Sequence, residues 1–150
     1  MQGHIFGRKY IDQWTWAHLY DPRSQFAFEG LNARGLAVFY FYYEGKVYHL
    51  NSILRGFQNS SQSGFDSWNF SATTCDLTFR GEIKTSVSNI TGVTYLDTFG
   101  IPLYCHNSKL SDAKISVYRH DKLERSFEFK NLCAFEFVSR TKVEKVNWVL

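Results

Sequence analysis

The alternation of large and small side chains is the feature that most constrains how this chain folds. From Asp12 to Tyr20, the even positions carry bulky or ring side chains and the odd positions carry smaller ones. Successive side chains of a β-strand point to opposite faces, so this period of two predicts a strand with one ring-bearing face. Similar segments recur, separated by turn-forming residues roughly every 8–12 residues. No long amphipathic helix is expected.

The same pattern places strands along most of the chain. Residues 51–56 are expected to hold a helical turn. Residues 58–64 are small and polar, so they are expected to form a mobile loop. Strands are predicted at residues 12–20, 25–34, 36–43, 47–50, 67–73, 76–84, 92–96, 103–106, 114–120, 126–130, 134–140 and 143–150.

These strands predict an all-β, antiparallel barrel of about 8–10 strands, because closure removes the sheet edges that aromatic strands would otherwise expose. Residues 1–150 are expected to form one domain. The run at residues 36–43 has apolar or aromatic side chains on both faces. We therefore expect another surface to cover it, which would be a second domain, a second copy of the chain or a local helix.

Composition excludes several classes of protein. With 44% hydrophobic and 18% aromatic residues, the chain has enough apolar surface to fold, so it is not expected to be disordered. No apolar run approaches the ~20 residues of a membrane span. The 17 basic and 14 acidic residues are dispersed along the chain, whereas nucleic-acid binding favours a clustered basic stripe. We expect neither a membrane span nor a nucleic-acid partner.

The cysteines predict buried free thiols in a reducing compartment. Cys75, Cys105 and Cys133 are odd in number and widely spaced, which does not suit a disulfide framework. The first residues lack the basic-then-apolar pattern of a secretory signal. We therefore expect a cytoplasmic protein.

No cofactor or metal is expected. No two histidines have the close spacing typical of metal ligands, and no glycine-rich phosphate-binding motif occurs. Cys105 and His106 are adjacent, so on a strand they would point to opposite faces and could not act as a catalytic pair.

Short motifs resemble one protein family. Residues 3–7 (Gly-His-Ile-Phe-Gly), followed by Trp-Thr-Trp-Ala-His at residues 14–18, resemble the start of the barrel in the tocopherol cyclase-like and carotenoid hydratase-like lipocalin families. Residues 92–97 resemble the Tyr-x-Asp strand end of the hydratase branch. Residues 134–140 are similar to that group's last strands. One departure is that His18 follows Trp16 by two residues, whereas the hydratase branch places the histidine before the tryptophan.

The resemblance implies a lipocalin-like (calycin-type) barrel with an apolar cavity, often present as a tandem pair, so this chain is expected to be a whole domain or half of a two-barrel parent. Members of these families bind or act on isoprenoids and similar polyene or polyketide chains. Some cyclise or hydrate a carbon–carbon double bond without a metal or organic cofactor.

The main prediction for function is therefore binding of an apolar small molecule of isoprenoid, fatty-acyl or polyketide type inside the barrel. Aromatic side chains would supply most of the binding energy through apolar burial. Core filling is the alternative interpretation of the two tryptophans. The expected ligand-binding residues are Trp14, Trp16, Tyr20, Phe28, Tyr40 and His4.

Two further functions stay open. The first is a cofactor-free cyclase, hydratase or isomerase. In this case Asp97, His18 and Tyr95 would be catalytic, and the tryptophan rings would stabilise a carbocation. The alternative for Asp97 is to close a turn, and for His18 to be a core histidine bonded to the backbone. The second is a structural barrel that forms a homodimer through residues 36–43.

Overall fold

Almost the whole described chain is extended, as the period of two predicts. The computed structural model describes residues 12–149 and contains eleven strands and two short helices. In chain order these are β1 (Trp14–Asp21), β2 (Phe26–Ala33), β3 (Leu36–Tyr43), β4 (Lys46–Leu50), α1 (Ile53–Gln58), β5 (Ser60–Ser63), β6 (Ser67–Thr73), β7 (Leu77–Lys84), the 3-10 helix η1 (Val87–Asn89), β8 (Thr91–Leu96), β9 (Pro102–Arg119), β10 (Lys122–Ser139) and β11 (Asn147–Trp148).

Three tight hairpins connect neighbouring strands. Each has two successive residues with positive φ at its tip: Arg34 and Gly35 (52° and 79°), Glu44 and Gly45 (51° and 73°), and His120 and Asp121 (47° and 64°). Such pairs form type I′ turns, whose twist matches that of the flanking strands. These turns set the register of β2 with β3, of β3 with β4 and of β9 with β10.

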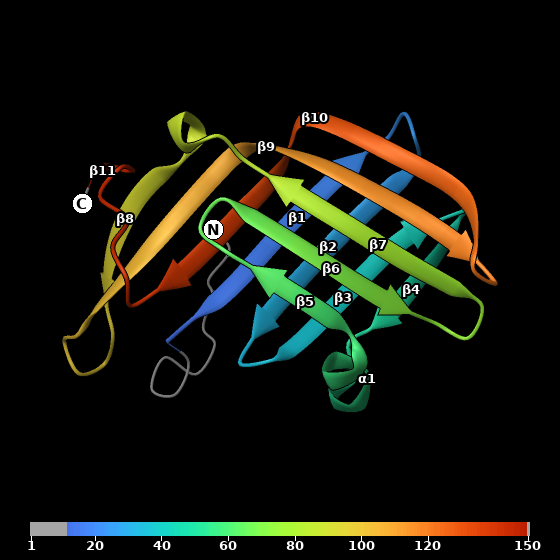
Figure 1. The fold of residues 1–150 in the computed structure, drawn as a ribbon, viewed down its shortest axis with the longest axis horizontal. Coiled ribbons are helices and arrows are strands. Elements are labelled where there is room, and N and C mark those ends of the chain that lie inside the picture. The colour runs from blue at the N-terminus through green and yellow to red at the C-terminus, as the bar shows by residue number, and fades with distance from the viewer. Residues whose placement is uncertain (1–11, 150) are drawn as a thin grey trace.

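All the strands belong to one sheet that folds over itself into two layers. Its order is β4-β3-β2-β1-β10-β9-β7-β6-β5, and β8 and β11 lie off this path. The 18-residue strands β9 and β10 link the layers: residues 102–107 of β9 pair with β8, and residues 112–119 pair with β7. Figure 1 shows β5, β6 and β7 crossing in front of β1, β2 and β3. The register shifts between β9 and β10 around Cys133, where the strands bend.

The predicted closed barrel is wrong, because the ends of the sheet do not meet. β4 and β5 are the two ends of the strand order, and no pairing joins them among residues 12–149. They are only five and four residues long, and the helix α1 separates them (Figure 1). The prediction of an all-β, mainly antiparallel fold is confirmed.

Stacked rings fill the space between the two layers. Phe41 of β3 lies 4.0 Å from Phe79 of β7, measured between ring centroids, with the planes 6° apart. Phe28 of β2 lies 5.0 Å from Phe70 of β6, also stacked. The Phe28–Phe70 distance lies within the range of about 4.5–7 Å preferred by aromatic pairs, and the Phe41 and Phe79 rings are closer still. Nearly every inward position of β2, β3, β6 and β7 is buried, so the interior is a packed core.

The prediction that the ring-bearing face of the opening strand lines the interior is also wrong. Ala17 and Leu19 are fully buried in the core, whereas Tyr20 is 59% exposed. Residues 14, 16, 18 and 20 therefore lie on the outer face of β1. The small inward side chains have a physical cause: Ala17 pairs with Gly30, where a Cβ would lie 2.8 Å from the rings of Phe39 and Trp68. The core is too full there for another indole.

Several strand boundaries differ from the prediction. The segments 103–106 and 114–120 are parts of β9, and 126–130 and 134–140 are largely parts of β10. Residues 60–63, expected to be loop, form β5 on the edge of β6. The last predicted strand covers residues 143–150; in its described part, 143–149, only Asn147–Trp148 form a strand, which pairs in parallel with β8.

A local helix covers part of the two-sided strand β3, as one of the alternatives predicted. The backbone of α1 lies against the outer side chains of β3, and a Cβ on Gly56 would be 2.3 Å from Leu36 Cδ1 and 3.3 Å from Val38 Cγ1. Tyr40 and Tyr42, farther along the same face, stay exposed. The helix therefore covers one end of the outer face only.

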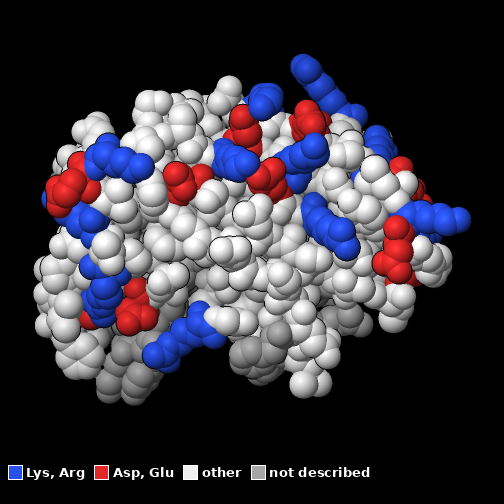
Figure 2. Space-filling view, in the orientation of Figure 1, with Lys and Arg blue, Asp and Glu red and all other residues white. Residues whose placement is uncertain are grey.

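Charges on the surface are mixed in sign. Figure 2 shows lysines and arginines interspersed with acidic residues on the face in view. Pairs such as Lys114 with Glu128 and Lys130 with Asp112 join the neighbouring strands β9 and β10. Within residues 12–149, no helix has the length and apolar character needed to span a membrane.

Gly81 gives a test of the packed core. A Cβ at this position would lie 2.0 Å from Phe70 Cζ, so Gly81→Ala forces the ring out of its place. We expect the free energy of unfolding, measured by urea denaturation, to fall by about 1–3 kcal/mol. Gly64→Ala is the control, since its added methyl would meet only Ser67 Oγ at 3.9 Å. Equal stability of the two variants would contradict a filled interior.

Candidate functional site

The outer side of β1–β4 carries a cluster of rings, of which three tyrosines are exposed and Trp16 is only 6% exposed. We call this surface the outer aromatic face and define it by Trp16, His18, Tyr20, Glu29, Tyr40, Tyr42 and Val47. Tyr20, Tyr40 and Tyr42 are 59%, 38% and 36% exposed, and Val47 is 55% exposed. Scattered apolar residues are usual on a surface, but a contiguous group marks a candidate interaction site.

Strand register arranges these side chains in two rows. Tyr20, Ala27, Tyr42 and Val47 lie opposite one another across four strands. Since neighbouring strands are ~4.8 Å apart, Tyr20 and Tyr42 start roughly 10 Å apart. The methyl group of Ala27 lies between them and leaves the space above it open. The second row contains His18, Glu29, Tyr40 and His49.

The rows enclose a shallow hollow of about 210 Å³. The backbone of β2 and β3 forms its floor, because Phe28 and Phe41 point into the core. The hollow is smaller than the ~300–1,000 Å³ of an ordinary ligand pocket. Its lining residues are His18, Ala27, Phe28, Glu29, Tyr40, Phe41, Tyr42 and Val47.

Polar contacts hold the rings at one end of the hollow. Trp16 Nε1 donates to Glu29 Oε1 at 3.1 Å, and the Trp16 ring stacks on His18 with centroids 6.1 Å apart. The Asn51 amide donates to the Tyr40 hydroxyl at 2.5 Å. A Trp N–H needs an acceptor when it is buried. The carboxylate of Glu29 supplies that acceptor on the outer face and gives this end of the hollow a negative charge.

Trp14 belongs to a separate cluster on the same side of the sheet. Its Nε1 donates to Glu136 Oε1 at 3.1 Å, and the Asn107 amide donates to Glu136 Oε2 at 3.2 Å. Cys105 lies buried beside this group, and burial raises the pKa of its thiol. Tyr95 is a neighbour of Cys105 and is 43% exposed. A thiol held in its neutral form is a poor nucleophile.

Asp97 closes the turn after β8 and is fully engaged there. Its Oδ1 accepts hydrogen bonds from the N–H groups of Phe99 and Ile101 at 2.8 and 2.9 Å. Its Oδ2 accepts one from Arg140 Nη2 at 2.7 Å. The Ile101 N–H and the Arg140 guanidinium, in that order, hold the pKa of Asp97 below its usual range. An ionised carboxylate has no proton to donate, so this arrangement suits turn closure rather than general-acid catalysis.

The structure does not bring the three predicted catalytic residues together. His18 is on β1, Tyr95 is on β8, and Asp97 follows β8 directly. In the sheet, β10 and β9 lie between β1 and β8. Three strand spacings separate them by roughly 14 Å. One substrate atom cannot contact both His18 and Asp97 across that distance.

The predicted ligand-binding residues are divided among three places. Trp16, Tyr20 and Tyr40 share the outer aromatic face with His18. Phe28 is 1% exposed and points into the core, and Trp14 contacts Glu136 instead. His4 lies outside the described residues. Among residues 12–149, no group of three or more His, Cys, Asp or Glu side chains could hold a metal ion.

Sequence reasoning missed three members of the hollow: Glu29, Tyr42 and Val47. The register of the hairpins carried a usable signal, because the turns at Arg34-Gly35 and Glu44-Gly45 determine which residues lie opposite His18 and Tyr20.

No known protein family, curated protein or solved structure matches this chain.

The role of Asp97 can be tested by its pH dependence. We expect Asp97→Asn to lower the urea midpoint at pH 7, because the ion pair with Arg140 is lost. A carboxyl group with a lowered pKa stabilises the fold above its unfolded pKa of ~3.9, and that contribution disappears as the pH falls through the lowered value. The difference between variant and wild type should therefore shrink below about pH 4.

Asp121→Asn is the control for this substitution. Asp121 is exposed and has a positive φ of 64°, which asparagine tolerates. It should leave the urea midpoint nearly unchanged at both pH values. A destabilisation by Asp97→Asn that is the same at pH 7 and pH 3 would show that the charge of Asp97 has no part in holding the turn.

Proposed function

We propose that this protein binds a planar, apolar small molecule on the outer aromatic face. The observation that supports this is the open hollow over Ala27, which Tyr40, Tyr42 and the carboxylate of Glu29 line. Exposed Tyr20 lies opposite Ala27 on β1, next to this hollow. A flat ligand placed there would contact two rings and have a polar group near one edge. This is the ligand class expected from the sequence, but its place is the outer surface of the sheet instead of a barrel interior.

The shape of the hollow favours flat molecules over flexible chains. Because the hollow is open, it covers one side of a ligand only, so the ordering cost of a fatty-acyl chain would offset most of the gain. A conjugated isoprenoid or an aromatic polyketide is already planar. With about 12–15 heavy atoms at about 0.4 kcal/mol each, such a ligand binds with a dissociation constant near 0.1 mM.

The two other functions have less support. A cyclase or hydratase needs its acid and its other catalytic groups at one shared site, whereas His18 of β1 lies two intervening strands away from Tyr95 and Asp97 at the end of β8. Edge-to-edge dimerisation through residues 36–43 is not available, since β3 is paired with β2 on one side and β4 on the other. A homodimer would have to use the faces of Tyr40 and Tyr42.

The family resemblance and the cellular location stay proposals. The sheet is mainly antiparallel but open, so the proposal of a lipocalin-like domain, whole or one half of a two-barrel parent, rests on the short sequence motifs. All three cysteines are unpaired; Cys105 and Cys133 are buried as predicted, whereas Cys75 is exposed, so the prediction is wrong for that residue. Burial raises the pKa of Cys133 to about 12. Unreactive buried thiols are common in reducing compartments, and on that basis we propose a cytoplasmic location.

Binding can be tested by NMR titration of the ¹⁵N-labelled protein. The probes are β-ionone for the isoprenoid class, 6-methylsalicylate for the polyketide class and decanoate for the fatty-acyl class. We expect β-ionone, which carries a flat enone, and the planar 6-methylsalicylate to shift amide signals of β1, β2 and β3, and decanoate to bind more weakly. Absence of shifts with all three, or shifts confined to other strands, would contradict the proposal.

Ring removal tests whether the tyrosines bind the probe. Tyr20→Ala and Tyr42→Ala should each weaken binding of β-ionone by roughly 5–10-fold, the equivalent of about 1–1.5 kcal/mol for one aromatic contact. Leu123→Ala is the matched control: Leu123 is 59% exposed, as Tyr20 is, but it lies in the β9–β10 hairpin. If all three variants bind β-ionone equally well, the two tyrosine rings do not contact the ligand.

A further inference from the structure

His106 is a buried histidine with one unused nitrogen. It lies on β9, and its side chain is wholly buried. Its Nδ1 is 3.1 Å from the carbonyl oxygen of Phe137. A carbonyl oxygen only accepts, so Nδ1 carries the proton and Nε2 is a bare acceptor. No atom within residues 12–149 makes a hydrogen bond to Nε2.

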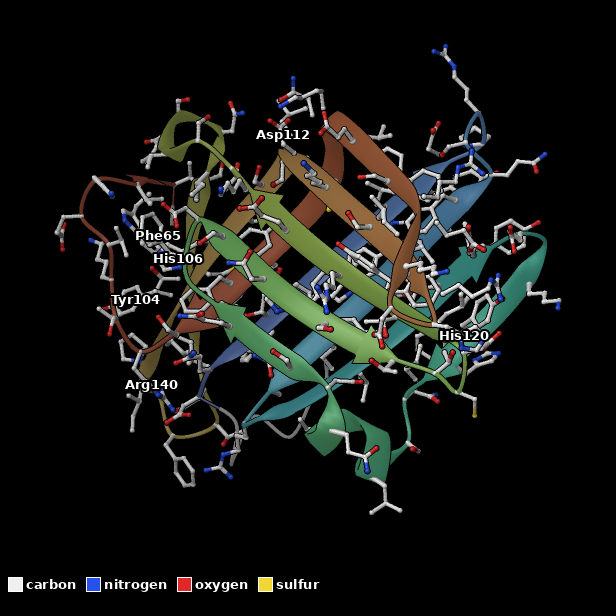
Figure 3. All side chains as sticks on the ribbon, turned by 45° about the vertical axis from the view of Figure 1, so that its right-hand side comes forward. Phe65, Tyr104, His106, Asp112, His120 and Arg140 are labelled. Carbon is white, nitrogen blue, oxygen red and sulfur yellow. The ribbon has the colours of Figure 1, made fainter. Side chains whose placement is uncertain are left out.

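Aromatic rings enclose this histidine. Phe65, Phe137 and Trp148 have ring centroids 5.8, 5.9 and 5.3 Å from that of His106. Figure 3 shows Phe65 beside His106 at the end of the sheet where Tyr104 also lies. Rings give Nε2 no hydrogen-bond partner, so the site accommodates a neutral imidazole only.

Trp148 reaches this site from the last described segment of the chain. We call residues 140–149 the C-terminal strap. The strap passes over β8, and the indole of Trp148 lies against Gly92, where a Cβ would be 2.5 Å from the ring. The Val149 N–H donates to the Gly92 carbonyl at 3.0 Å. The strap therefore covers both the edge of β8 and one side of His106.

The two ends of the strap are attached differently. At its start, Arg140 donates to Asp97 and to the carbonyl groups of Ile101 and Pro102. At its far end, Trp148 and Val149 contact Gly92 and His106 as described above. The indole N–H donates within the strap, to Val143 at 3.0 Å. Opening of the far end therefore breaks the pairing with β8 and the ring contacts of Trp148 with His106 and Tyr104, and leaves the Arg140 anchor in place.

The charges around His106 would not stabilise a second proton on the ring. From the strap, Lys145 Nζ lies 4.8 Å from the Phe65 ring and Lys142 Nζ lies 5.5 Å from the Trp148 ring. Glu144 is 3.9 Å from Lys142. The other acidic residues near the enclosing elements have their own partners: Glu136 of β10 faces Trp14, and Asp66, next to Phe65, accepts from Ser67.

We propose that the C-terminal strap is a pH-sensitive latch: protonation of His106 Nε2 displaces Trp148 and releases the far end of the strap from β8. In the closed state, burial lowers the pKa of His106. In the open state the ring meets water and titrates near its ordinary value of ~6.5. Acidification therefore favours the open state, and release uncovers the edge of β8 at Thr91 and Gly92.

The direction and size of the effect follow from linkage. Above about pH 7, both states are neutral and the closed form is favoured. Below about pH 6.5, the open state binds a proton that the closed state excludes, so the opening constant rises up to tenfold per pH unit. Between pH 7.5 and 5.5 the largest expected change is about tenfold.

Hydrogen exchange measured by NMR tests this latch. The protection factor of the Val149 amide, corrected for the intrinsic exchange rate at each pH, reports opening of the strap. We expect it to fall up to tenfold from pH 7.5 to 5.5, while the amides of Phe79 and Ile115 in the core keep theirs. A Val149 protection factor that does not change with pH would overturn the proposal. A parallel loss at the core amides would also overturn it, since that reports global unfolding.

Substitutions separate His106 from other titrating groups. His106→Phe keeps an aromatic ring in the enclosure without a titrating nitrogen, so the pH dependence of Val149 should disappear. His120→Asn is the control, because His120 is exposed and its φ of 47° suits asparagine; it should keep the full dependence. Trp148→Ala should leave Val149 weakly protected at every pH. Persistence of the pH dependence in His106→Phe would overturn the proposal.

Discussion

Ring-on-ring packing between the two layers of the folded sheet is the interaction on which the rest of the structure depends. Phe28, Phe39 and Phe41 of one layer meet Trp68, Phe70 and Phe79 of the other. Rings of this size leave room only for small residues beside them, which is why Ala17, Gly30 and Gly81 occupy inward positions. Packing of the core therefore determines which face of β1 points inward, and the tryptophans of that strand lie on the opposite face.

The orientation of β1 also determines where the candidate site lies. The phenol rings of Tyr20, Tyr40 and Tyr42 are exposed, whereas the indole of Trp16 is only 6% exposed. The indole N–H groups on this side of the sheet find carboxylate partners. Glu29 and Glu136 accept from Trp16 and Trp14 in this way. The outer aromatic face is thus a consequence of a full interior, and the hollow over Ala27 is where a small residue interrupts the rings. A ligand would use this surface because the core has no space for one.

The sequence predicts where the strands are better than how they are oriented. The bounds of β3 and β6 agree with the predicted residues 36–43 and 67–73, because alternation and turn residues are local signals. The direction of β1 depends on the volume available between the layers, which is set by residues of other strands such as Phe39 and Trp68. The joining of segments into β9 and β10 depends on bulges, and closure of the sheet depends on whether β4 and β5 meet. None of these is visible in a local pattern.

The candidate site shows the same limit. Trp16, His18, Tyr20 and Tyr40 were expected on one surface and do share one, since that follows from period and register. Asp97 was expected near them, but order along the chain does not reveal that two strands lie between. The environment of His106 combines Phe65, Phe137 and Trp148, which are far apart in the sequence. Only the fold brings these residues together.

The central claim, that the rings of the opening strand face outward around a solid core, is tested most directly by aromatic NMR spectra with a soluble paramagnetic agent. Ring signals of Tyr20, Tyr40 and Tyr42 should broaden strongly on addition of the agent, while those of Phe28, Phe39 and Phe41 should keep their intensity. Protection of Tyr20 together with broadening of Phe28 would show the opposite orientation and contradict this account.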